Sequence, residues 1–126
     1  MNKEKELNAI DIQLYTLIFF LITTGISIAL TYNQKLSLEK KKTLFSSKES
    51  LKITLFNRKL IVLLSFIFLY VNIKLYNLSK DQGEDLKPYT LQIVASLLAI
   101  VSGLIALYVV SLSNTETVAD VENPII

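Results

Sequence analysis

The stretch YTLQIVASLLAIVSGLIALYVVS, residues 89–111, contains no charged side chain. At 1.5 Å per residue, its roughly 23 residues form a helix about 34 Å long, which is enough to cross the hydrocarbon core of a bilayer. Pro88 comes directly before it, and proline suits the first position of a helix because its missing N–H has no intrahelical partner there. We therefore predict a membrane-spanning helix over residues 89–111.

A second uncharged stretch, residues 12–32, has about 21 residues and is also long enough to span. The triplet Ser27-Ile28-Ala29 raises the alternative of a cleavable signal peptide. Two features oppose that reading: the leader mixes acidic and basic residues, and the apolar run is longer than the 7 to 15 residues of a typical signal-peptide core. We predict a retained span over residues 12–32.

The middle span, residues 60–78, is the weakest of the three. Only about 14 uncharged residues separate Lys59 from Lys74, a length that also fits a re-entrant or interfacial segment. The segment spans if the Lys74 ammonium extends to the lipid headgroups, as lysines near helix ends do. With that interpretation, the fold class is an all-α integral membrane protein, a single domain (1–126) formed by a bundle of three transmembrane helices.

The connection between the first two spans, residues 33–59, is strongly basic and sets the expected orientation. Short loops rich in lysine and arginine stay in the cytoplasm, so we expect an N-out, C-in arrangement. Ser46 and Glu49 have the spacing of a capping box, which predicts a short interfacial helix within this loop that continues into the middle span. The basic residues either only set topology or also bind anionic lipid headgroups. They include Lys40, Lys41, Lys42, Lys48, Lys52, Arg58 and Lys59.

Small and polar residues recur on the predicted spans and are candidates for helix packing. Helices associate in lipid where small residues let backbones approach closely and where polar side chains bond across the interface. The alternative is that these residues line a water-filled lumen; we favour packing because alanine and glycine are typical of contacts. The candidate packing residues are Gly25, Ala29, Ala95, Ala99, Gly103 and the amide Asn72. Ala95, Ala99 and Gly103 follow one another at steps of four residues and are predicted to form one stripe on the third span.

The composition removes several classes of function. The sequence has neither cysteine nor histidine, which excludes disulfides, thiolate nucleophiles, imidazole bases and Cys/His metal sites. Arg58 is its one arginine, so a cluster of guanidinium groups for phosphate recognition is absent and nucleic acid is not an expected partner. We expect no enzyme activity, no cofactor and no metal site. The tail, residues 113–126, is acidic and is predicted to be disordered.

These features predict a membrane protein of the plasma membrane, with a bacterial source suggested by the abundance of lysine, isoleucine and asparagine. The expected partners are membrane lipids and either a second membrane protein or further copies of the chain. In outline the sequence is also similar to small phage-type holins, which share three spans and the N-out, C-in arrangement. That resemblance implies a pore-forming alternative, although the acidic tail departs from the basic tail usual in holins.

Overall fold

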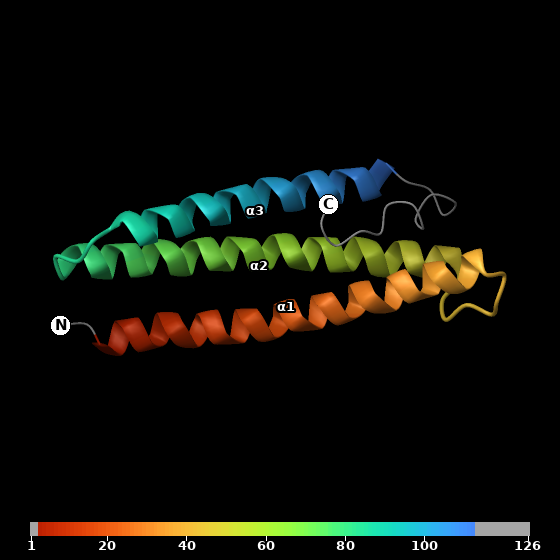
Figure 1. The fold of residues 1–126 in the computed structure, drawn as a ribbon, viewed down its shortest axis with the longest axis horizontal. Helices are drawn as coiled ribbons and strands as arrows, with labels where there is room; N and C mark the ends of the chain where they lie inside the picture. Colours follow the sequence, from red (N-terminus) through yellow and green to blue (C-terminus); the bar gives the residue numbers. More distant parts are fainter. Residues whose placement is uncertain (1–2, 113–126) are drawn as a thin grey trace.

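The computed structural model describes residues 3–112, which form three long antiparallel helices (Figure 1). They are α1 (Lys3–Leu38), α2 (Ser47–Asp81) and α3 (Lys87–Leu112). Each is long and apolar enough to cross a membrane, and together they pack as a bundle. The predicted fold class is therefore confirmed, including the helical nature of the weak middle segment. The prediction of disorder for residues 113–126 lies outside the described residues.

The first two helices are longer than the apolar runs that predicted them. α1 has 36 residues and α2 has 35, so each is more than 50 Å long at about 1.5 Å per residue and exceeds a hydrocarbon core of about 30 Å. Residues 33–59, expected as a loop, are mostly helical, and the turn between α1 and α2 occupies residues 39–46. The helix predicted to start near Ser46 and to continue into the middle span forms the first turns of α2.

Local sequence signals account for where the helices begin and end. Ser46 and Glu49 form the predicted capping box at the start of α2. The bond from the Ser46 backbone N–H, and then the Ser46 side chain, lower the pKa of Glu49, which lies before the apolar part of the helix. The stabilisation of the start of α2 by ionised Glu49 is therefore fully present above the normal pKa of a glutamate side chain. It is lost as the pH falls through the lowered pKa of Glu49. At the other end of α2, Gly83 adopts a φ of 71°, which glycine allows without strain.

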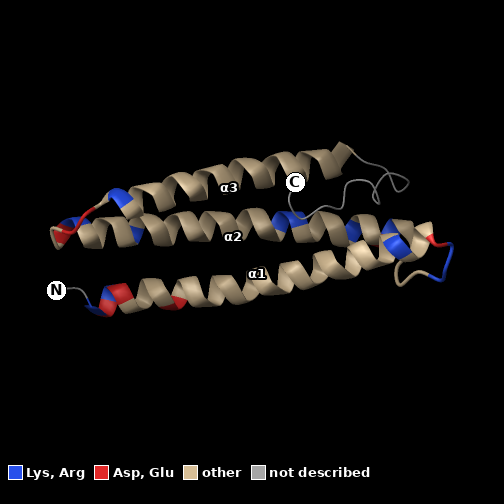
Figure 2. Cartoon of the chain, in the orientation of Figure 1, with Lys and Arg blue, Asp and Glu red and all other residues tan. Residues whose placement is uncertain are grey.

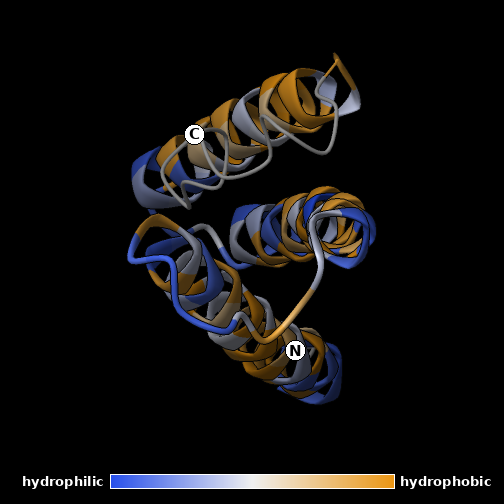
Figure 3. Cartoon of the chain, turned by 90° about the vertical axis from the view of Figure 1, so that its right-hand side faces the viewer, coloured by the Kyte–Doolittle hydropathy of each residue, from blue (hydrophilic) through white to orange (hydrophobic). Residues whose placement is uncertain are grey.

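The middle helix holds the bundle together. α2 packs against both α1 and α3, whereas α1 and α3 hardly touch each other within residues 3–112. The end-on view shows the same arrangement, with α2 between the other two helices (Figure 3). Phe20 of α1 stacks on Phe68 of α2 with ring centroids 5.1 Å apart. Because α1 and α3 are not packed together, α2 has one side open between them.

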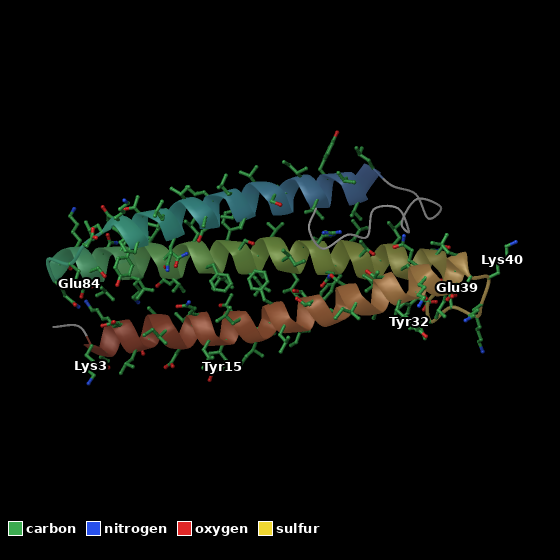
Figure 4. The ribbon with its side chains drawn as sticks, viewed as in Figure 1. Lys3, Tyr15, Tyr32, Glu39, Lys40 and Glu84 are labelled. Carbon is green, nitrogen blue, oxygen red and sulfur yellow. The ribbon has the colours of Figure 1, made fainter. Side chains whose placement is uncertain are left out.

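The bundle is apolar on the outside and largely polar or small at its helix interfaces. Large side chains such as Leu21 and Leu98 are exposed, while Thr23, Ser27 and Asn57 are buried. Tyr15 and Tyr32 point outward from α1, on the side away from α2 (Figure 4). Charged residues gather toward the two ends of the bundle (Figure 2). This distribution is typical of a protein whose surroundings are lipid rather than water.

Candidate functional site

Asn57 joins α1 and α2 near the middle of α1. Its amide Nδ2 donates to the Thr23 backbone carbonyl at 3.3 Å and to Ser27 Oγ at 3.0 Å, and the three side chains are almost completely buried. Thr23 in turn donates to the Phe20 carbonyl. The hydroxyls of Thr23 and Ser27 therefore lie against α2, where Ser27 accepts the bond that crosses between the helices, whereas Thr24 and Thr31 are exposed.

Asn33 joins α1 to the turn and to the start of α2. Its Oδ1 accepts from the backbone N–H groups of Leu44 and Phe45 at 2.7 and 2.8 Å. Its Nδ2 donates to Ser50 Oγ at 3.1 Å and to the Phe45 carbonyl at 3.3 Å. One buried side chain thus makes four hydrogen bonds and fixes how the chain reverses direction.

Asn72, predicted as a packing residue, lies at the interface between α2 and α3. Its Nδ2 donates to Ser96 Oγ and to the Gln92 carbonyl of α3. Gly103, also on the predicted packing stripe, is buried against Val62 of α2, where an added Cβ would lie 3.2 Å from Val62 Cγ2. The two contacts align α3 antiparallel to α2 over most of its length.

The other predicted packing residues are less buried by the described helices. Ala95 and Ala99 are exposed, and Ala29 is half-buried. Gly25 is exposed, and a Cβ added there would meet nothing within 4 Å. The stripe predicted on the third span therefore divides: Gly103 is buried against α2, whereas Ala95 and Ala99 are exposed.

A cavity of about 180 Å³ lies on the open side of α2, between α1 and α3. We call it the α1/α3 groove. Small residues of α3 form one wall and Phe20 of α1 contributes to the other. The lining includes Phe20, Arg58, Ser65, Ala99, Ser102 and Ala106.

Arg58 differs from the expectation for a residue that sets topology at the membrane surface. Its side chain is only 4% exposed and lines the α1/α3 groove beside Ala106. Ala106 lies six residues before the end of α3, so Arg58 is about 9 Å inside that end, level with the apolar part of α3. The sequence placed Arg58 in a loop, whereas α2 is already helical there and is packed beside α3.

The remaining basic candidates are at the surface. Lys40, Lys41 and Lys42 lie in the exposed turn between α1 and α2, and Lys48, Lys52 and Lys59 are exposed on α2. Lys74 is half-buried, and its Nζ lies 5.8 Å from the centre of the Tyr70 ring. Lys40, Lys41, Lys42, Lys48 and Lys52 lie at the turn end of the bundle and give it a positive charge to which headgroup phosphates can bind.

Two buried polar atoms at the interface between α1 and α2 have no hydrogen-bond partner in the described part of the chain, Thr54 Oγ1 and Asn57 Oδ1. The Thr54 side chain is fully buried. A buried hydroxyl without a partner costs free energy that an apolar group of the same shape does not. Thr54 Oγ1 and Asn57 Oδ1 are therefore buried polar atoms that do not stabilise this interface through a hydrogen bond within the described residues.

We therefore expect Thr54→Val to leave the free energy of unfolding unchanged or to raise it by about 1 kcal/mol. Thr16→Val is the control, because the Thr16 hydroxyl donates to the Ile12 carbonyl at 2.7 Å and its removal gains nothing. Reversible unfolding in mixed detergent micelles, followed by circular dichroism, measures both variants. A clear destabilisation by Thr54→Val would show that its hydroxyl has a partner.

Two residues at the centre of these contacts, Asn33 and Asn57, were not singled out by the sequence analysis. Both lie in or next to the basic stretch that was expected to be a loop, so their amides looked solvated. A usable signal did exist for Asn57, since Thr23 and Ser27 are one helical turn apart and together present a carbonyl and a hydroxyl to one donor.

Comparison of the chain with protein-family models, with curated proteins and with solved structures gives no match. The chain is a small three-span helical membrane protein.

Proposed function

We propose that this protein acts without catalysis, by associating with other membrane-spanning helices as an accessory subunit or through self-association. The observation that carries the proposal is the exposed small-residue face of α3, formed by Ala95, Ala99 and Ser102, of which Ala99 and Ser102 also line the open α1/α3 groove. Small residues let a further helix approach the backbone closely, which is how helices associate where lipid is as apolar as leucine.

The polar interfaces within the bundle support this proposal over a pore. The hydroxyls of Thr16 and Thr23 donate to carbonyls of their own helix, and Ser27 accepts from Asn57. A conducting lumen needs polar groups that remain hydrated. In this bundle the buried hydroxyls of Thr16, Thr23 and Ser27 are already hydrogen-bonded, whereas the exposed small face of α3 is suited to dry contact.

Cross-linking tests the proposed association directly, because the chain has no native cysteine. We expect Ala95→Cys to form a disulfide-linked dimer in membranes, or a covalent adduct with a partner subunit, upon mild oxidation. Val101→Cys is the matched control, since Val101 is exposed on a different face of α3. Adding Ala99→Leu to the Ala95→Cys variant should reduce the cross-link about fivefold or more, as expected for a loss of about 1 kcal/mol of association.

Equal cross-linking from Ala95→Cys and Val101→Cys would contradict the proposed interface. Expression that depolarises cells, with the effect abolished by Ser102→Ala, would replace it by the holin-like pore. Both measurements are made on the full chain in the membrane.

We further propose the plasma membrane of a bacterium as the location, with the turn end of the bundle in the cytoplasm. The turn between α1 and α2 and the end of α3 lie at the same end of the bundle, and this end holds most of the exposed lysines (Figures 1 and 2). Basic surfaces of this kind are retained on the cytoplasmic side, where anionic headgroups also stabilise them.

Single cysteines at Ser47 and Gln82 test the orientation, because both positions are exposed and lie at opposite ends of α2. In intact cells an impermeant maleimide should label Gln82→Cys and not Ser47→Cys. Permeabilised cells provide the control, in which both variants should react. The reverse pattern in intact cells would place the basic turn outside.

A further inference from the structure

A second groove, of about 550 Å³, lies between α2 and α3. We call it the α2/α3 groove. Its lining residues are Leu55 and Lys59 of α2 and Leu104, Leu107, Tyr108 and Ser111 of α3. Arg58 and Ala106, one position away on each helix, line the α1/α3 groove instead. Because successive residues of a helix point in different directions, the two grooves lie on opposite sides of the contact between α2 and α3.

The walls of the α2/α3 groove are made of large side chains. Leu104 is 46% exposed and Tyr108 is 63% exposed, whereas Leu55 and Leu107 are half-buried. Large side chains that project from a helix keep a neighbouring helix at a distance, since close helix contacts in lipid need small residues. A flexible hydrocarbon chain fits between such side chains. The apolar part of this groove therefore favours a lipid acyl chain over a further helix.

Lys59 adds a positive charge to this apolar groove. The contact of Gly103 with Val62 fixes the register of the antiparallel helices α2 and α3. Lys59 therefore lies level with the residue three positions after Gly103, about 9 Å inside the end of α3. A lysine at this depth lays its four-carbon stem along apolar surface while its ammonium reaches toward the headgroups. The groove thus combines an apolar wall with a cation close to the membrane surface.

The charge of Lys59 is not neutralised by the helices that form the groove. In the described part of the chain Lys59 takes part in no ion pair. α3 contains no acidic residue, and α2 has none between Glu49 and Asp81. Glu49 is ten residues before Lys59, about 15 Å along the helix. An anion from the surroundings of the bundle can therefore pair with Lys59.

The same face of α2 carries further positive charge toward the turn. Lys48, Lys52 and Lys59 are exposed and follow one another at steps of four and seven residues, which places them on one face of the helix. Lys59 is the member of this basic stripe that enters the groove. Basic pockets between membrane helices on the cytoplasmic side are typical sites for anionic lipid headgroups.

We infer that the α2/α3 groove binds an anionic phospholipid, with its phosphate paired to the Lys59 ammonium and one acyl chain along Leu104 and Leu107. The exposed Tyr108 hydroxyl lines the same groove and supplies a donor for a phosphate oxygen. This site is separate from the proposed helix association, which uses the small face formed by Ala95 and its neighbours. Lipid and partner helix can therefore be bound at the same time.

Tryptophan quenching tests the site, because the chain has no native tryptophan. Leu104→Trp places the fluorophore in the groove, and Ile105→Trp is the matched control, exposed at the same depth but outside the groove. Each full-length variant is reconstituted into vesicles that contain brominated phosphatidylglycerol or brominated phosphatidylcholine. We expect phosphatidylglycerol to bind at position 104 about fivefold better than phosphatidylcholine, and the two lipids to bind almost equally at position 105.

Charge variants of the Leu104→Trp protein identify the cation. Lys59→Gln should abolish most of the fivefold preference, whereas Lys59→Arg should retain it. Lys42→Gln removes the same charge from the turn and should leave the preference nearly unchanged. Both lysines are exposed, so the helices remain folded. High salt should weaken the preference, because an exposed charge pair is screened. Inorganic phosphate at constant ionic strength should not change it.

Equal preferences at positions 104 and 105, or equal losses from Lys59→Gln and Lys42→Gln, would overturn the inference in favour of general surface charge. Displacement of the lipid by inorganic phosphate would overturn it in favour of a free anion. Protection of Leu104→Trp from both brominated lipids would overturn it in favour of a protein occupant. The proposed function is read separately from the Ala95→Cys cross-link, so each can fail without the other.

Discussion

Asn33→Ala is expected to lower the free energy of unfolding by about 2 to 3 kcal/mol. The substitution removes all four hydrogen bonds that tie α1 to the turn and to Ser50. It also leaves the backbone N–H groups of Leu44 and Phe45 without their acceptor, and a buried group that loses its partner costs more than the bond itself contributed. The effect should appear as a lower midpoint of unfolding in mixed micelles.

Two further variants separate the Asn33 contacts from a general effect of losing an amide. Asn8→Ala makes the same change at an exposed position of the same helix and should alter stability by less than about 0.5 kcal/mol. Asn33→Asp keeps the acceptor for Leu44 and Phe45 but loses the two donated bonds, so its effect should fall between the two. If Asn33→Ala and Asn8→Ala are equally stable, the contacts of Asn33 with the turn do not hold the hairpin together.

The number and type of helices could be predicted because hydrocarbon selects for long uncharged runs. Residues 12–32 and 89–111 each satisfy that requirement alone, and both lie within helices of the structure. The start of α2 could also be predicted, since the capping box of Ser46 and Glu49 depends only on residues close in sequence. Such local signals need no knowledge of how the helices pack.

The helix ends beyond the apolar runs could not be predicted in the same way. Apolarity marks the part of a helix that lies in lipid, and it says nothing about how far the helix continues into water. α1 runs on to Leu38 and α2 begins at Ser47, so lysines that looked like loop residues belong to helices or to a tight turn. Arg58 illustrates the difference: the sequence suggests an exposed loop residue, whereas the side chain is a buried part of α2.

The polar contacts of the candidate site depend on the register between helices. Asn57 meets Ser27, and Arg58 lies level with Ala106, because α1 and α3 run antiparallel to α2 with particular offsets. Sequence periodicity indicates which residues share a face of one helix, but the offset between two helices is set by the whole interface. The stripe on α3 was therefore predicted as one surface, although Gly103 and Ala99 have different surroundings.

Gly103→Leu is expected to destabilise the fold by about 2 to 3 kcal/mol or more, because this position is in contact with α2. Even a Cβ at Gly103 would lie 3.2 Å from Val62 Cγ2 and 3.9 Å from Val62 Cα. A larger side chain must push α2 and α3 apart, and overpacking of a close interface typically costs this amount. It would also strain the nearby bonds from Asn72 to Ser96 and Gln92.

A double-mutant cycle isolates this contact. Gly103→Ala alone should cost about 1 kcal/mol, and Val62→Ala should reduce that cost because it removes the Cγ2 atom that the new methyl group meets. Ala99→Leu is the matched control: Ala99 is exposed, so the same large side chain should reduce association between chains while leaving unfolding in micelles nearly unchanged. If leucine at 99 and at 103 destabilise the monomer equally, α3 does not present one face to α2 and another to a partner. Opposite responses in the two assays would assign Gly103 to folding and Ala99 to association.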